Sequence, residues 1–104
     1  MNMQQMMAQA QKMQRELKKA QAELAQKEFV ISKGGAVTVT VLGNKEVKSI
    51  DIDNDAFDPD NKEMIEDMIA LAINEAIKQI DEESEAINER ITGQPGGFGF
   101  LWKN

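Results

Sequence analysis

The sequence contains no cysteine, no histidine and no tyrosine. The lack of cysteine excludes disulfides, thiolate metal sites and cysteine nucleophiles, and makes a reducing compartment the simplest setting. The lack of histidine leaves the serines without an imidazole to activate them, so few general bases remain. We therefore expect no catalytic residues, no enzymatic activity and no cofactor.

Long apolar runs and an excess of positive charge are absent as well. No stretch approaches the roughly 18 apolar residues of a membrane span, and the first ten residues lack the basic start and apolar run of a signal peptide. The formal net charge is -6. Phosphate contacts need Lys and Arg, so any nucleic-acid site must be local. We expect a cytoplasmic protein with no membrane or small-molecule partner.

The first part of the chain has the periodicity of a long helix. Its apolar residues recur at spacings of three and four, which is a heptad pattern. They are Met3, Met6, Ala10, Met13, Leu17, Ala20 and Leu24. No glycine or proline interrupts residues 2–27, which predicts one helix of roughly 39 Å at about 1.5 Å per residue.

Strand-forming residues follow the helix. They lie in three short segments, 29–31, 36–42 and 46–53. Valines and threonines alternate in the middle segment, so it should present one apolar and one polar face. Gly34-Gly35 and Gly43-Asn44 should supply the positive φ angles of tight hairpin turns. We expect a three-stranded antiparallel meander that is covered on one side.

A second long helix should begin near Asp58-Pro59-Asp60, with Asp60 and Glu63 at capping-box spacing. Its broad apolar face suits packing on a sheet and narrows to a seam toward the carboxyl end. Gly93 should end it. The sequence thus predicts an α+β fold of order α-β-β-β-α in one domain, residues 1–93. A flexible, glycine-rich, apolar-tipped tail, residues 94–104, should follow.

A count of apolar faces favours a homodimer. Three short strands offer one face, which the second helix covers, so the stripe on the first helix is left over. The predicted dimer seam consists of Met3, Met6, Met13, Leu17, Leu24, Ile80 and Ile87. Pairing of the two helices within one chain would hide part of this stripe, and a monomeric helix hairpin on a sheet is the alternative.

The acidic run at residues 51–55 invites comparison with a calcium-binding EF-hand loop. The register fails, because Ala56 takes the position of the invariant glycine and Lys62 that of the bidentate glutamate. We expect no metal site there, and interpret the run as a strand end followed by a helix cap.

Basic residues cluster on the first helix. Lys12, Arg15, Lys18 and Lys19 fall opposite the apolar stripe at about 100° per residue. In a two-fold dimer this row occurs twice and would grip DNA phosphates from two sides. The spacing of four between Lys12 and Glu16 also allows ion pairs along the helix. From the residues alone, this ion-paired surface is the slightly favoured interpretation.

Four segments resemble the YbaB/EbfC family of bacterial nucleoid-associated proteins. They are MNMQQMMAQAQKMQ (1–14), GGAVTVTV (34–41), IDID (50–53) and DPDNKEMIEDMI (58–69). The resemblance covers residues 1 to about 93. It implies a tweezer-like homodimer of α-β-β-β-α subunits whose long helices project as arms and bind double-stranded DNA. It also implies a cytoplasmic, nucleoid location.

Carried over to this chain, the resemblance implies DNA-binding positions on both arms. They are Lys12, Arg15, Lys18 and Lys19 on the first helix, with Lys78 and Arg90 on the second. The acids between Asp81 and Glu89 would repel phosphate, which favours contact through the first helix. We expect low sequence specificity. Alternatives are an adaptor that recruits recombination or replication proteins and, less favoured, an amphipathic membrane-surface helix.

Overall fold

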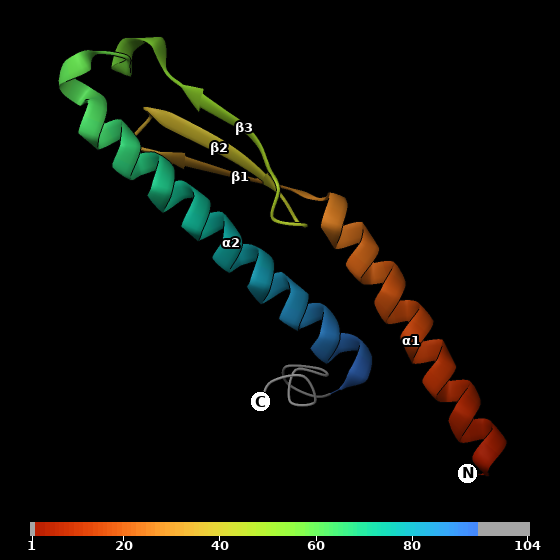
Figure 1. Cartoon of the computed structure of the whole chain (residues 1–104). Helices are drawn as coiled ribbons and strands as arrows, with labels where there is room; N and C mark the ends of the chain where they lie inside the picture. The colour runs from red at the N-terminus through yellow and green to blue at the C-terminus, as the bar shows by residue number, and fades with distance from the viewer. Residues whose placement is uncertain (1, 94–104) are drawn as a thin grey trace. The chain divides into compact units, whose positions relative to one another are not determined.

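The computed structural model of the chain describes residues 2–93 and confirms the α-β-β-β-α order (Figure 1). The elements are α1 (Met3–Gln26), β1 (Glu28–Lys33), β2 (Val37–Leu42), β3 (Val47–Ile52) and α2 (Lys62–Thr92), with 3₁₀ turns at Asn54–Ala56 and Pro59–Asn61. The predicted tail, residues 94–104, lies outside the described residues.

The described residues form two compact units. Among the described residues, the helical unit contains 2–24 and 82–93, and the sheet unit is Ala25–Asp81. Helix α2 contributes its first part to the sheet unit and its last part to the helical unit.

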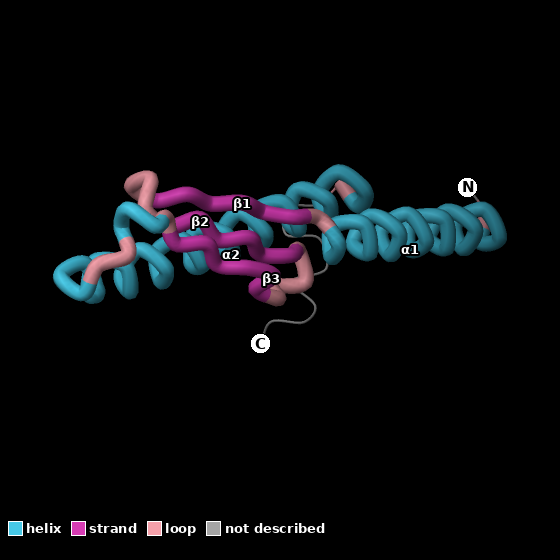
Figure 2. Tube along the Cα trace, turned by 90° about the horizontal axis from the view of Figure 1, so that it is seen from above, coloured by secondary structure: helices cyan, strands magenta, loops and turns pink. Residues whose placement is uncertain are grey.

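The sheet unit is an antiparallel meander of order β1-β2-β3. Its core is the face of β2 that carries Val37, Val39 and Val41, each at most 1% exposed. Ala72 and Ala76 of α2 are fully buried, and Figure 2 shows the strands lying over the first part of α2. Alternation of valine with threonine therefore produces the sheet that was expected, covered on one side.

The two hairpin turns differ from each other. Gly34 and Gly35 both have positive φ, and Ala36 N–H donates to Lys33 O at 3.0 Å, which closes a tight turn inside the three-residue connection between the paired residues Lys33 and Val37. In the second turn the positive φ of 73° belongs to Lys45, so the expectation for Gly43-Asn44 was wrong. Gly43 instead donates its N–H to the carbonyl of Lys27 at 2.9 Å.

The helix ends are fixed by local hydrogen bonds. Asn2 Oδ1 accepts from Gln5 N–H at 2.8 Å and Gln5 Oε1 accepts from Asn2 N–H at 3.2 Å, a reciprocal cap that starts α1. Ahead of α2, the side chain that accepts a backbone N–H is Asp58, which bonds Asp60 N–H at 2.8 Å. Gly93, with φ of 72°, follows the last residue of α2 as predicted.

Three residues of the predicted dimer seam are already buried inside one chain. Leu24 and Ile87 are 5% and 8% exposed in the helical unit, and Ile80 is 2% exposed in the sheet unit. Their side chains have almost no surface left for a second copy. The structure therefore places these three in the interior of the single chain, because pairing within the chain occupies that part of the stripe.

Candidate nucleic-acid interface

The cations of α1 form a row of exposed side chains. Lys12, Arg15, Lys18 and Lys19 are all exposed. Met13 and Leu17, which alternate with them, are partly buried. Because the apolar stripe turns inward, the cations turn outward, as the helical spacing predicts. We call these four residues the cationic row.

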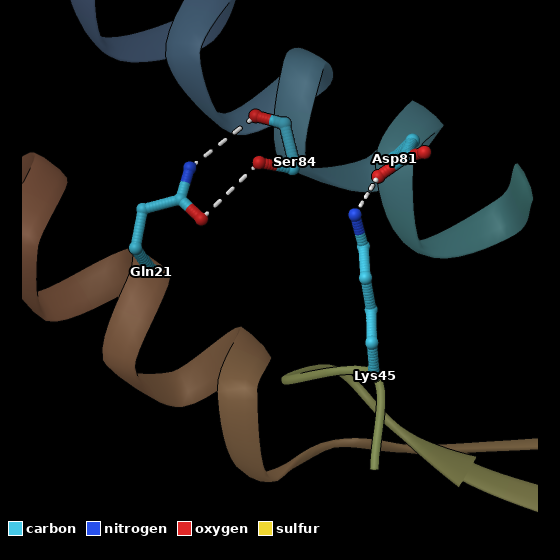
Figure 3. Close-up of polar contacts among 4 residues, drawn as sticks. All are labelled: Gln21, Lys45, Asp81 and Ser84. Carbon is cyan, nitrogen blue, oxygen red and sulfur yellow. Dashed lines mark hydrogen bonds and ion pairs between the residues drawn. The ribbon is translucent and has the colours of Figure 1, made fainter. Parts of the chain in front are cut away.

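The cationic row makes no ion pair with any residue between 2 and 93. The four-residue spacing of Lys12 from Glu16 thus permits a pair that the helix does not form. In the sheet unit, by contrast, Lys45 Nζ lies 2.9 Å from Asp81 Oδ1 (Figure 3), and Lys48 Nζ lies 2.9 Å from Glu28 Oε1. The row therefore keeps its charges available for an external anion.

Of the two DNA-binding residues predicted on α2, Lys78 and Arg90, only Arg90 lies beside the cationic row. It lines a shallow groove of about 310 Å³ in the helical unit together with Lys19. Glu16, Ala20, Glu23 and Ile91 complete the groove. Lys78, the other α2 candidate, is exposed on the sheet unit.

Acidic residues restrict where a polyanion can approach the helical unit. Residues 82–92 of α2 carry Glu82, Glu83, Glu85 and Glu89 against Arg90 alone. These carboxylates would repel phosphate, whereas α1 carries four basic residues against two acidic ones. The outward face of α1 is therefore the most favourable surface of this unit for an anionic polymer.

A polar cluster that sequence reasoning missed joins the two helices of this unit. Gln21 Nε2 donates to Asn88 Oδ1 at 3.1 Å and to Ser84 O at 3.4 Å. Ser84 Oγ donates to Gln21 Oε1 at 3.3 Å (Figure 3). Such a cluster in an apolar seam fixes the register of one helix against the other. The sequence feature that could have indicated this cluster is Ser84, a polar residue at a position of the helical repeat otherwise occupied by isoleucines such as Ile80 and Ile87.

The acidic run at 51–55 has a structural role. Asp53 Oδ1 accepts from Asp55 N–H at 3.2 Å and caps the first 3₁₀ turn, while Asp53 N–H donates to Ala36 O at 2.8 Å. This agrees with a strand end followed by a cap. Within the described residues, no group of three or more Asp, Glu, His or Cys is placed to hold a metal ion. In the same part of the chain, neither helix has the length and apolar character needed to span a bilayer.

The fold and this surface define a small α+β protein that presents, on one long helix, a row of cations without an ion pair among residues 2–93. Such a surface suits an extended anion because each phosphate meets a charge that is already exposed.

The chain belongs to the YbaB/EbfC DNA-binding family, whose model matches residues 1–95. It is 49% identical to a nucleoid-associated protein of Clostridium novyi, over 94% of this chain and 90% of the relative. It is 48% identical to one from Agathobacter rectalis, over 92% and 86% of the two chains. A third, from Ruminiclostridium cellulolyticum, is 43% identical over 93% and 85%. The resemblance seen in the sequence is thereby confirmed.

Proposed function

We propose that two copies of this chain form a homodimer that binds double-stranded DNA through its phosphates, with little sequence specificity. The observation that carries the proposal is the cationic row, four exposed cations without an ion pair among residues 2–93. Family membership and the names of the relatives support DNA in the bacterial nucleoid, and hence the cytoplasm, as its setting. A dimer bound there would influence nucleoid organisation and gene expression.

Low specificity follows from the chemistry of the row. Lysine and arginine bind phosphate oxygens, which are the same at every base pair, so these contacts position the protein without reading sequence. Each phosphate neutralised also releases condensed counterions, which makes the affinity depend on salt. A single row offers few contacts, so two rows in a dimer bind far better than one.

A surface for dimerisation lies at the β3 side of the sheet unit. β3 is an edge strand whose residues Val47 and Ile50 are exposed, and Phe57 beyond it is 75% exposed. An edge strand presents unpaired backbone groups that a second chain can bind. Beside it lies a groove of about 360 Å³, with Ile52, Phe57, Ile65 and Ile69 as its apolar lining.

Charges at the rim of this groove suit a two-fold interface. Asp58, Lys62 and Glu66 lie there along with the apolar side chains. In a two-fold pair each residue of one copy can face a different residue of the other, so Lys62 of one chain would face a carboxylate of its partner. We propose this surface as the interface in place of the predicted seam, because Leu24, Ile80 and Ile87 of that seam are buried within the chain.

Two double variants with the same change of charge test the function. Lys18→Ala with Lys19→Ala removes half of the cationic row, whereas Lys45→Ala with Lys48→Ala removes two cations that are already ion-paired in the sheet unit. Because the first variant removes about four phosphate-binding cations per dimer, it should bind duplex DNA more weakly by roughly 100-fold or more at 100 mM salt, and the second should bind much as the unaltered protein does. Fluorescence anisotropy with a random-sequence duplex measures both. Equal losses in the two variants would refute the assignment to α1.

A further inference from the structure

The first turns of α1 carry an apolar face that nothing in the described chain covers. Every residue from Asn2 to Lys12 is exposed. Met3 is 76% exposed, Met6 58% and Met7 56%. Spacings of three and four place these methionines on one side of the helix, and we call them the methionine face. An apolar group of this size on a helix with a firm cap needs a partner.

The end of α2 stops short of this face and points toward it. Gln21 contacts Ser84 and Asn88, while the earlier residue Lys19 shares its groove with the later residue Arg90. The two helices of the helical unit are therefore antiparallel. Packing on α1 begins only at Met13, so about ten residues, or roughly 15 Å of helix, extend past the end of α2 (Figure 1).

The chain that follows α2 has the reach and the chemistry to cover the methionine face. Residues 94–104 lie outside the described residues, and this 11-residue segment can span up to about 36 Å when extended, over twice the distance required. Its sequence contains Phe98, Phe100, Leu101 and Trp102. Aromatic rings make favourable contacts with the sulfur of methionine, whose flexible side chain adapts to their shape.

We infer that residues 98–102 dock on the methionine face of the same chain. The same chain is favoured over a second copy because α2 delivers the segment at the correct end of α1. Gly93, with φ of 72°, turns the backbone out of the helix at that point. The docked segment covers Met3, Met6 and Met7, while the cationic row on the opposite side of the helix stays open. This inference does not depend on DNA binding.

Trp102 is the only tryptophan and the chain has no tyrosine, so its fluorescence reports docking directly. Docking should lower the acrylamide quenching constant of the full chain roughly two- to threefold relative to the Met3→Gln, Met6→Gln, Met7→Gln variant, because burial removes most of the exposed area of the indole. Leu71→Gln changes an exposed apolar residue of the sheet unit and serves as the control, with the quenching constant unchanged. Equal quenching in the full chain and the methionine variant would overturn the inference.

Dilution separates the same chain from a second copy. Protection of Trp102 within one chain is independent of protein concentration, whereas protection by a partner disappears on dilution. Loss of protection on dilution would overturn the inference.

Methionine oxidation gives a second readout, since exposed thioethers oxidise to sulfoxides. Phe100→Ser with Trp102→Ser should accelerate oxidation at Met3 and Met6 and leave Met64 of the sheet unit unchanged. Oxidation rates at Met3 and Met6 that are the same in the variant as in the unaltered protein would also overturn the inference.

Discussion

Replacing Phe57 by serine should dissociate the proposed homodimer. The ring is 75% exposed in the single chain, so its removal costs the fold little. Fully burying a phenylalanine contributes about 1.5–3 kcal/mol, and three quarters of that is about 1–2 kcal/mol. The ring occurs twice in a two-fold interface, which gives about 2–4 kcal/mol, or a dissociation constant raised roughly 30- to 1,000-fold.

Sedimentation equilibrium over a range of concentrations measures this shift. The matched control is Leu71→Ser, which removes a side chain of α2 that is 60% exposed and does not line the groove beside β3. The control should keep the dissociation constant of the unaltered protein. An unchanged dimer in Phe57→Ser, or dissociation of the Leu71→Ser control to the same extent, would refute the interface at β3.

Two further predictions concern the stability of the two units. Gly34→Ala and Gly35→Ala should each lower the free energy of unfolding by roughly 1–2 kcal/mol, because both residues have positive φ and the one close contact of a new Cβ, with Met68 Cε at Gly34, is relieved by movement of a flexible side-chain end. Urea unfolding measures both variants, and an unchanged free energy of unfolding in either would contradict the turn described. Gln21→Ala should lower the stability of the helical unit by about 1 kcal/mol because it removes hydrogen bonds between the helices, while the exposed Gln14→Ala should not. Thermal unfolding followed by circular dichroism distinguishes them, and equal melting temperatures would show that the polar cluster is not stabilising.

The elements of the fold could be predicted because each has a strong period of its own. The expected helix at 2–27 is α1, Met3–Gln26, and the expected meander has its three strands in the expected order. The turn at Lys45 was missed for a physical reason. Glycine adopts positive φ most easily, but closure of the loop decides which residue must adopt it, and here Gly43 is held by its bond to Lys27.

The DNA-binding residues and the dimer seam could be predicted only in part from the sequence. A heptad stripe indicates that a helix has an apolar partner, but it does not tell whether that partner belongs to the same chain, so Leu24 and Ile87 were assigned to a dimer. Spacing of four likewise allows ion pairs without requiring them, so the ion-paired surface that was slightly favoured for Lys12 and Glu16 is not what the helix forms. Burial of Leu24 and Ile87 and the side-chain position of Lys12 depend on packing in three dimensions, which no local sequence pattern encodes.

The central claim is that the cationic row binds DNA phosphates, and its most direct test is the salt dependence of binding to a random-sequence duplex. If about six phosphates are contacted per dimer, the plot of log K against log salt should have a slope of about -5, and affinity should fall roughly 10³-fold between 50 and 200 mM. A slope near zero, or no binding even at 50 mM salt, would contradict the account.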